Sequence, residues 1–278
     1  TTRDAGQLLS SENASDRIGA DIDPVAWLFT VELVRSLGLI AATLRTGNMS
    51  RFEQARKKLA ALAEMALRTL SEDAALVVYL LQQVAEGYAR ASLYGPIRTL
   101  AEMNPEKEAR LLDFARDQFG RGRGVLWSSQ LLGLKRLVDE SSFALCTPTG
   151  SGKTLVANLA LVKELLLKPA APLFAPLALY IVPSRALAGE VETKLRSELG
   201  QDMIVTALYG GADWGITDFW LTGDEPAVVV VTVEKAEALL RYLGPQLIAR
   251  LSLLVIDEAH QVVPDAKGQT IERFAEHG

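Results

Sequence analysis

The chain has 278 residues, of which 49% are hydrophobic and 23% are charged, and this balance is that of an ordinary globular protein. It excludes a disordered chain, a collagen-like rod and a disulfide-stapled miniprotein. The formal net charge is -5, so no global positive field attracts nucleic acid, and any such binding has to come from local geometry. One cysteine, Cys146, and two histidines leave no ligand set for a zinc cluster and no internal disulfide, so we expect a reducing compartment. The most apolar early stretch, 25–44, is interrupted by Glu32 and Arg35, and we expect no membrane span.

The first half of the chain predicts helices. Capping residues begin four helical patterns, at Asp23-Pro24, Ser50-Arg51-Phe52-Glu53, Ser71-Glu72-Asp73 and Asn104-Pro105. Apolar residues follow at steps of three or four: Phe52, Ala55, Leu59, Leu62, Ala66 and Leu70, continued by Leu76, Leu80 and Val84. We therefore expect an all-α N-terminal domain at residues 1–119, a module for packing or for binding a protein partner.

The segment 120–125 contains three glycines and two arginines and breaks any helix, so we place a linker there. Its arginines either contact phosphate or belong to a solvated basic loop. Beyond it, short apolar runs alternate with helical patterns, which predicts an α/β domain at 126–278 with a parallel sheet and crossover helices. The expected strands are 143–146, 178–182, 204–208, 228–231 and 253–256.

A glycine-containing loop between a strand and a helix carries the strongest chemical signal. The segment Thr147-Pro148-Thr149-Gly150-Ser151-Gly152-Lys153-Thr154 follows the strand expected at 143–146 and precedes the helical pattern 155–167. Glycines let successive backbone N–H groups converge on a polyphosphate at a helix N-terminus. Lys153 would reach the β and γ phosphates, and the Thr154 hydroxyl would bind Mg²⁺. The general P-loop pattern has glycine where this chain has Thr147.

Two acids supply the second half of such a site. Asp257 and Glu258 follow the apolar run 253–256, which exposes both carboxylates at the carboxyl end of a strand, where open α/β sheets bind ligands. Asp257 would hold the Mg²⁺ shell, and Glu258 would orient or deprotonate the attacking water. An Asp-Glu pair alone fits a solvated strand end equally well, but its pairing with a P-loop favours ATP hydrolysis.

The segments 149–154 (Thr-Gly-Ser-Gly-Lys-Thr) and 257–260 (Asp-Glu-Ala-His) together resemble motifs I and II of superfamily 2 DExH-box helicases. Between them, 180–188 is similar to motif Ia, Gly210-Gly211 to the glycine motif and 231–235 to motif Ib, and 268–272 is similar to a Gly-x-x-x-Glu of the superkiller-like branch. The resemblance covers about 126–272. It implies a RecA-like motor domain at 126–278, with a second motor domain, outside these 278 residues, that supplies arginine fingers.

The resemblance also assigns residues to nucleic acid. Ser184, Arg185, Gly211 and Thr232 are the candidates. Motifs Ia and Ib each follow an expected strand and open a helix, so backbone amides and a hydroxyl or an arginine can meet backbone phosphates without reading sequence. For Arg185, the alternative is an ordinary arginine at a helix N-terminus.

Three further residues near these motifs need a separate interpretation. Gln130 occupies the place of the family's adenine-reading glutamine, against the alternative of a helix-surface glutamine. His260 in the family links the nucleotide site to the nucleic-acid surface and the second domain, against the alternative of a solvated loop histidine. Cys146 is expected to be a small buried strand residue.

We therefore expect part of an ATP-dependent helicase or translocase, with ATP and Mg²⁺ as cofactors and single- or double-stranded DNA or RNA as partner. The chain alone is expected to hydrolyse ATP poorly. One alternative is a duplex translocase or remodelling subunit of a defence or restriction system, and another is an ATPase switch whose helical domain binds a protein partner. A cytoplasmic location fits, with association with the nucleoid as a variant.

Overall fold

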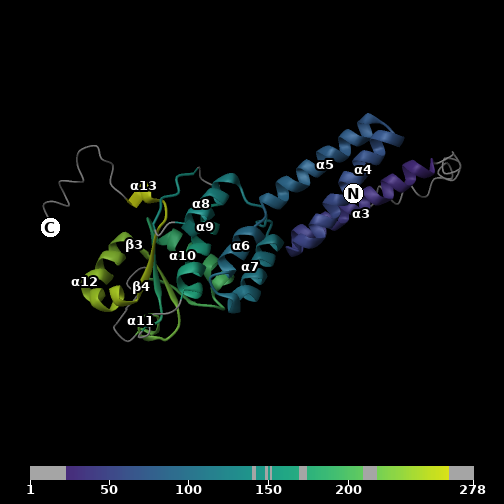
Figure 1. Cartoon of the computed structure of the whole chain (residues 1–278). Coiled ribbons are helices and arrows are strands. Elements are labelled where there is room, and N and C mark those ends of the chain that lie inside the picture. Colours follow the sequence, from purple (N-terminus) through teal and green to yellow (C-terminus); the bar gives the residue numbers. More distant parts are fainter. Residues whose placement is uncertain are drawn as a thin grey trace, which may run out of the picture. The chain divides into compact units, whose positions relative to one another are not determined.

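The computed structural model describes residues 23–139, 142–147, 150, 152–168, 174–208 and 218–262. Its contacts divide the chain into two compact units (Figure 1). The first unit holds the described residues up to Tyr94 together with Arg116–Val125. The second holds Gly95–Ala115 together with the described residues from Leu126 onward.

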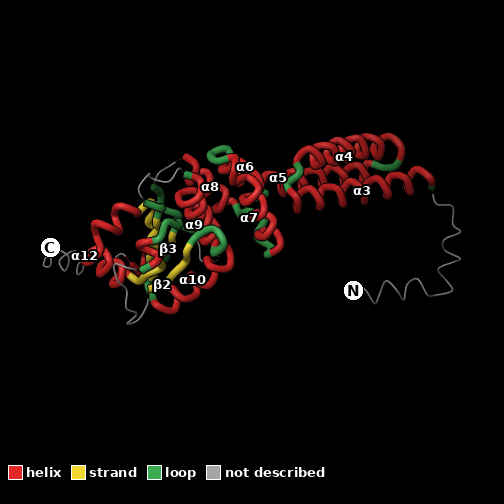
Figure 2. The backbone as a smooth tube through the Cα atoms, turned by 90° about the horizontal axis from the view of Figure 1, so that it is seen from below, coloured by secondary structure: helices red, strands yellow, loops and turns green. Residues whose placement is uncertain are grey.

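Three long helices form most of the first unit: α3 (Pro24–Thr46), α4 (Met49–Thr69) and α5 (Glu72–Arg90). α4 packs against both α3 and α5, and Figure 2 shows α3 and α4 running side by side. Their shared core contains four of the six residues of the predicted apolar row as well as residues from the two neighbouring helices: Ile40, Phe52, Ala55, Leu59, Leu62, Val78 and Ala85. The helical N-terminal region is therefore built around α4.

Side-chain caps fix where these helices begin. Asp23 accepts from the Val25 amide at the start of α3, and Ser71 accepts from the Ala74 amide at the start of α5, both as expected. α4 is capped by Asn48 rather than by Ser50, whose hydroxyl instead donates to the Asn48 side chain at 2.8 Å. The predicted cap was two residues late because Asn48 is itself a good N-cap residue and lies directly after the helix-ending Gly47.

The prediction for the buried face of α5 was wrong. Leu76, Leu80 and Val84 are 55%, 52% and 54% exposed, whereas Val78 and Ala85 are buried. α5 carries apolar residues on more than one side, so periodicity alone could not choose the side that packs on α4. An apolar row along α5 is therefore left at the surface of the described first unit.

Within the described residues, α3 is the one helix whose length and apolar composition would allow it to cross a membrane. Its inner side packs on α4 through Ile40, and Glu32 within it forms ion pairs with Arg35 and with Lys58 of α4. The absence of a membrane span stays a prediction.

Shorter helices follow α5. α6 (Tyr94–Ala101) was not among the predicted helices, while the predicted start at Asn104-Pro105 opens a 3₁₀ turn, η1 (Pro105–Lys107), that leads into α7 (Glu108–Gly120). α7 ends at Gly120, as the glycine-rich segment predicts. The chain then turns through Gly122, whose φ is +74°. Next it returns to the end of α5, where the Leu93 amide donates to the Gly124 carbonyl at 2.9 Å.

The division of contacts differs from the predicted boundaries. The expected linker at 120–125 belongs to the first unit, and residues 95–115 belong to the second. A bidentate ion pair holds the latter stretch: the Arg110 guanidinium of α7 binds the Asp202 carboxylate, with nitrogen–oxygen distances of 2.6 to 3.0 Å. As a statement about independent folding, the domain division stays a prediction.

The second unit is built on a parallel sheet of four strands in the order β2-β3-β1-β4. The strands are β1 (Leu177–Val182), β2 (Ile204–Leu208), β3 (Ala227–Thr232) and β4 (Leu251–Ile256), and every pair is parallel. The helices are α8 (Ser128–Asp139), α9 (Lys153–Val162), its π-helical extension η2 (Lys163–Leu167), α10 (Arg185–Leu199), α11 (Phe219–Thr222), α12 (Val233–Arg250) and α13 (Ala259–Val262). The predicted α/β fold with a parallel sheet is confirmed.

Both faces of the sheet are covered at the central strands β1 and β3. Alternate residues of β1 and β3, among them Leu179 and Val229, face α12 and form a core with Leu239 and Leu243. Figure 1 shows α12 on one side of the sheet and α9 and α10 on the other. Burial on both faces explains why β3 is a continuous apolar run.

The strand predicted at 143–146 is not formed. The described segment 142–147 carries no ladder to β4, and Cys146, expected to be buried, is exposed. The segment and β4 instead line the same cavity. An apolar run becomes a strand only where a neighbouring edge pairs with it, and here the space beside β4 stays open.

A buried arginine at the end of α12 links several backbone segments of the second unit by hydrogen bonds. The Arg250 guanidinium at the end of α12 is 5% exposed and donates to the backbone carbonyls of Ala175, Trp220, Leu221 and Glu225. It therefore satisfies four backbone acceptors, two in the short helix α11 and one in each of the segments that lead into β1 and β3.

Replacing Arg250 by Met should lower the free energy of opening of β3 by about 3 kcal/mol, because each buried carbonyl left without a donor costs roughly 1–3 kcal/mol. Native-state amide hydrogen exchange of β3 measures this quantity. The control is Arg241→Met on the same helix, whose exposed side chain pairs with Glu237; it should change the value by less than about 0.5 kcal/mol. If the two substitutions lower the free energy of opening of β3 equally, the hydrogen bonds of Arg250 do not stabilise this strand.

Candidate nucleotide site and nucleic-acid interface

The parallel sheet brings the predicted site residues to one edge. Val182 pairs with Thr232, and Ile181 pairs with Ile256, so the carboxyl ends of β1, β3 and β4 lie at the same level. The residues that follow these strands are the predicted ones: Ser184 and Arg185 after β1, Thr232 at the end of β3, and Asp257 and Glu258 after β4. This edge is where parallel α/β sheets bind ligands.

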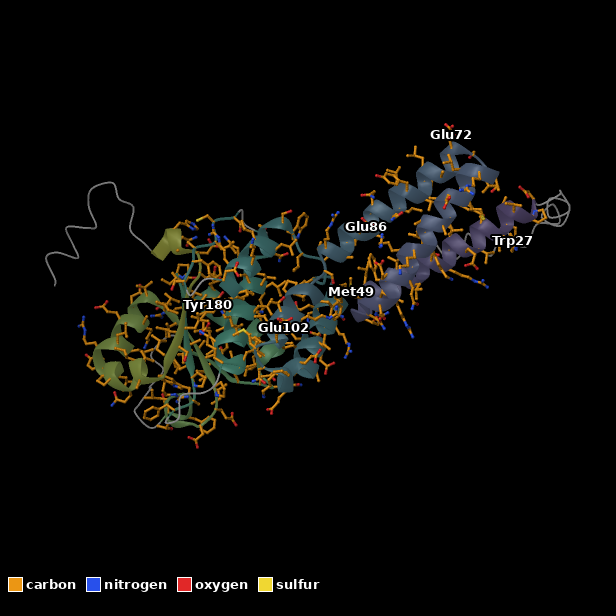
Figure 3. All side chains as sticks on the ribbon, viewed as in Figure 1. Trp27, Met49, Glu72, Glu86, Glu102 and Tyr180 are labelled. Atoms are coloured by element: carbon orange, nitrogen blue, oxygen red, sulfur yellow. The ribbon has the colours of Figure 1, made fainter. Side chains whose placement is uncertain are left out.

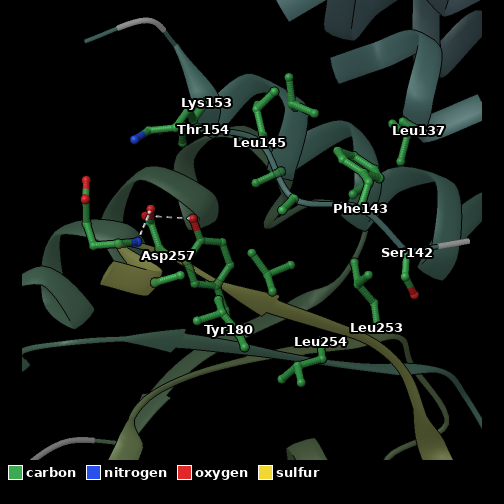
Figure 4. A pocket seen from close by; sticks show the side chains of 18 of the residues that line it. Leu137, Ser142, Phe143, Leu145, Lys153, Thr154, Tyr180, Leu253, Leu254 and Asp257 are labelled. Carbon is green, nitrogen blue, oxygen red and sulfur yellow. Dashed lines mark hydrogen bonds between the residues drawn. The ribbon is translucent and has the colours of Figure 1, made fainter. Parts of the chain in front are cut away.

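A cavity of about 930 Å³ lies between the α9 N-terminus and the end of β4. Five predicted residues line it: Lys153, Thr154, Asp257, Glu258 and His260. Figure 4 shows Lys153, Thr154 and Asp257 toward one end of the cavity, and Leu137, Ser142 and Phe143 toward the other. The structure therefore joins the two halves of the predicted nucleotide site.

The half of the site that is predicted to bind phosphate lies at the N-terminus of α9. Gly150 and Gly152 have φ values of +82° and +76°, a left-handed conformation that favours glycine. Lys153 is the first residue of α9, and its ammonium donates to the Thr147 carbonyl at 3.3 Å. Thr149 and Ser151, also predicted to bind nucleotide, lie outside the described residues. The described glycines thus have the backbone geometry that a phosphate-cradling loop needs.

Gln130 supports this loop from α8. Its side chain is buried, its amide oxygen accepts from the Trp127 amide at 2.8 Å, and its amide nitrogen donates to the Gly152 carbonyl at 3.0 Å. A Cβ on Gly152 would lie 2.1 Å from that nitrogen. Gln130 is thus a buried residue in contact with the loop and not a helix-surface glutamine, while its reading of adenine stays a prediction.

The half of the site that is predicted to be catalytic lies in a tight turn after β4. The Asp257 amide donates to the Ile181 carbonyl at 2.9 Å, which continues the β1–β4 ladder by one bond. Glu258 has a φ of +47°, a left-handed conformation that is uncommon for a residue with a side chain and that concentrates at functional sites. His260 is 71% exposed, with its Nδ1 3.3 Å from the Glu258 carboxylate. The turn therefore presents Glu258 and His260 together at the mouth of the cavity.

One residue of this site was not predicted. Tyr180, in the middle of β1, is 1% exposed, lines the cavity and donates its hydroxyl to the Asp257 carboxylate at 3.1 Å (Figure 4). Burial, and then the negative charge of Asp257, raise the pKa of the Tyr180 phenol far above its usual value, so the hydroxyl stays protonated and donates. The signal in the sequence was a tyrosine, with its polar hydroxyl, within an apolar strand, at the first position of the segment 180–188 that is similar to motif Ia.

The donors at this end of the cavity fit Mg²⁺. Thr154 offers a hydroxyl and Asp257 a carboxylate, and both are hard oxygen ligands. Among the described residues no cluster of three or more His, Cys, Asp or Glu could hold a metal by itself. Mg²⁺ is commonly held by one or two protein oxygens together with substrate phosphates and water, so this sparse set suits a Mg²⁺–nucleotide complex.

The predicted nucleic-acid residues lie beside the cavity lining. Ser184 caps α10, and its hydroxyl accepts from the Leu187 amide, with Arg185 next at the exposed helix start. Thr232 is buried at the start of α12. Its hydrogen bond, and more weakly the charge of Arg185, hold the pKa of Glu234 below its usual value. The pairing of Val182 with Thr232 brings the segments similar to motifs Ia and Ib side by side, while Gly211 and the segment 268–272 lie outside the described residues.

The chain belongs to the DEAD/DEAH box helicase family, whose model matches residues 127–278, more than half of its length. Both halves of the cavity, Lys153 with Thr154 and Asp257 with Glu258, fall within the matched segment. The RecA-like interpretation of the α/β region predicted at 126–278 is thereby confirmed.

Known relatives agree with the family. Over 127 residues the chain is 39% identical to the Hachiman protein HamB of Bacillus cereus, covering 45% of this chain and 11% of that protein. It is 33% identical over 158 residues to the ATP-dependent DNA helicase Hel308 of Thermococcus kodakarensis, covering 56% of this chain and 13% of the relative. The Hel308 of Pyrococcus horikoshii is 34% identical over 155 residues, covering 55% and 20%. The chain thus spans a fifth or less of each of these proteins.

Replacing Gly152 by Ala should weaken nucleotide binding about tenfold or more, because the left-handed conformation costs roughly 1–2 kcal/mol with a Cβ and the new methyl displaces Gln130. Titration with a fluorescent ATP analogue measures the affinity. Gly189→Ala is the control, since this α10 glycine has no atom within 4 Å of an added Cβ. Unchanged affinity in Gly152→Ala would show that the loop does not hold the phosphates.

Proposed function

We propose that this chain contains the nucleotide-binding half of an ATP-dependent motor that moves along a nucleic-acid strand. The observation that carries the proposal is that one cavity joins the α9 N-terminus, with Lys153 and Thr154, to the end of β4, with Asp257 and Glu258. A polyphosphate bound at the first group places its terminal phosphate toward the second. ATP with Mg²⁺ is the proposed nucleotide.

Each residue has a separate task in this proposal. Lys153 moves from the Thr147 carbonyl, its partner in the structure, to the β and γ phosphates. Thr154 and Asp257 hold Mg²⁺, which neutralises phosphate charge when it is bound. Glu258 orients the attacking water and accepts its proton. His260, which is exposed and lies next to Glu258, links the nucleotide site to the nucleic-acid surface and to the second motor domain.

The track of the motor is proposed from the interface and from the relatives. Ser184, Arg185 and Thr232 meet at the ends of β1 and β3, where helix N-termini and a cation can bind backbone phosphates. Two of the relatives are named ATP-dependent DNA helicases. We therefore favour DNA over RNA, with strand separation carried out together with a second motor domain that supplies arginine fingers.

Two alternatives to a strand-separating motor can be distinguished by experiment. A duplex translocase or remodelling subunit of a defence or restriction system would hydrolyse ATP on DNA without opening a tailed duplex in an unwinding assay. A partner-gated ATPase switch would need a binding face on the helical unit. The exposed apolar row of Leu76, Leu80 and Val84 on α5 favours a protein partner there, in addition to the motor function.

Replacing Glu258 by Gln should lower ATP turnover by about 100-fold or more, because the amide keeps the size of the side chain but accepts no proton. Nucleotide affinity should stay the same. Steady-state phosphate release and nucleotide titration in the full-length protein measure the two quantities. If turnover persists in Glu258→Gln, the hydrolytic role of this cavity is contradicted.

Replacing Arg185 by Ala should weaken single-stranded DNA binding and reduce the slope of log affinity against log salt by about one, because one phosphate contact is lost. Lys194→Ala removes the same charge from the same helix, where Lys194 pairs with Glu190. Fluorescence anisotropy at several salt concentrations compares the two. Equal slopes in the two variants would remove Arg185 from the interface.

A further inference from the structure

Tyr180 is a polar group in an apolar setting that the nucleotide motifs do not account for. It lies within the second unit (Figure 3), and Leu179 and Val182 of the same strand are fully buried and apolar. A phenylalanine would give the same strand propensity and nearly the same ring packing. Burying the additional hydroxyl costs free energy unless it is hydrogen-bonded, and its bond is to Asp257.

The strand register places this hydroxyl beside Asp257. Tyr180 pairs with Val255, and Asp257 lies two residues further along, on the same face of the sheet. Tyr180 and Asp257 are therefore diagonal neighbours across the β1–β4 pair, a separation that a long aromatic side chain spans. A residue one position earlier or later in β1 would point to the opposite face.

The Asp257 carboxylate is held at both oxygens. Oδ2 accepts from the Tyr180 hydroxyl at 3.1 Å, and Oδ1 accepts from the Glu258 amide at 2.9 Å (Figure 4). Two donors on two different oxygens fix the rotation of the carboxylate plane, and each oxygen keeps a lone pair for another partner. Asp257 thus meets its ligand already oriented.

We propose that Tyr180 is a positioning residue that orients the Asp257 carboxylate for the Mg²⁺ of a bound Mg²⁺–ATP complex. The inference rests on the proposed function, since it names an additional residue of the same site. Tyr180 acts through Asp257 and has no contact with the nucleotide in this proposal. Outer groups that hydrogen-bond a metal-ligating residue set its orientation, and their loss costs about 10–100-fold in metal affinity.

The test is Tyr180→Phe in the full-length protein, which removes the hydroxyl and keeps the ring. A fluorescent ATP analogue is titrated in EDTA and then at a series of Mg²⁺ concentrations. In the variant, the Mg²⁺ concentration that gives half of the Mg²⁺-dependent tightening should rise about tenfold, the lower end of the range for such groups. Affinity in EDTA should not change, because Lys153 and the α9 amides do not depend on the hydroxyl.

Two further variants make the result specific. Tyr242→Phe, on α12 with a side chain that is 72% exposed, controls for the substitution itself and should behave as the wild type. Asp257→Asn should remove the Mg²⁺-dependent tightening, and adding Tyr180→Phe to it should have no further effect, because the hydroxyl acts through the carboxylate.

The outcomes separate the two proposals. If the wild-type protein binds nucleotide equally with and without Mg²⁺, the proposed Mg²⁺–ATP site itself fails. If the wild type responds to Mg²⁺ and Tyr180→Phe responds identically, the positioning role of Tyr180 is overturned and the site stands. A loss of affinity in EDTA as well would show that the hydroxyl supports the fold, which also overturns the positioning role.

Discussion

Parallel pairing of β1 with β3 and β4 is the constraint on which the rest of the site depends. Because all of these strands run in one direction, every chain segment that leaves the sheet at its carboxyl edge leaves at the same level. The acidic turn after β4 and the helix starts after β1 and β3 are thereby gathered from parts of the chain that are far apart, and the N-terminus of α9 lines the same cavity as β4. An antiparallel strand in any of these positions would carry its site residues to the opposite edge.

Backbone conformation and charge then distinguish the two halves of the site at that edge. Gly150 and Gly152 have the left-handed conformation that the proposed phosphate loop needs, and Glu258 has a left-handed conformation of its own after β4. Negative charge sits on Asp257 and Glu258, where Mg²⁺ and an attacking water are proposed. Gln130 and Tyr180, both buried, hold one half of the site each, by hydrogen bonds to the Gly152 carbonyl and to the Asp257 carboxylate. Buried side chains next to the site therefore fix the orientation of the groups that line it.

Much of this was predictable because the signals are local. β1 to β4 are β-branched or apolar runs flanked by breakers, and the nucleotide motifs are contiguous in the chain. The strand expected at 143–146 has the same composition, but a ladder needs an adjacent edge, and composition does not report on it. The buried face of α5 was ambiguous because apolar residues lie on more than one side of that helix. Arg110 binds Asp202, 92 residues later in the chain, and the periodicity of apolar residues cannot predict such a pairing.

The central claim is that this edge of the sheet couples ATP hydrolysis to a nucleic-acid strand. The most direct measurement is steady-state ATPase activity of the full-length protein without polymer, with single-stranded DNA and with single-stranded RNA. We expect strong stimulation, and by DNA in preference to RNA. Basal turnover that neither polymer changes would contradict the motor and favour an ATPase gated by a protein partner.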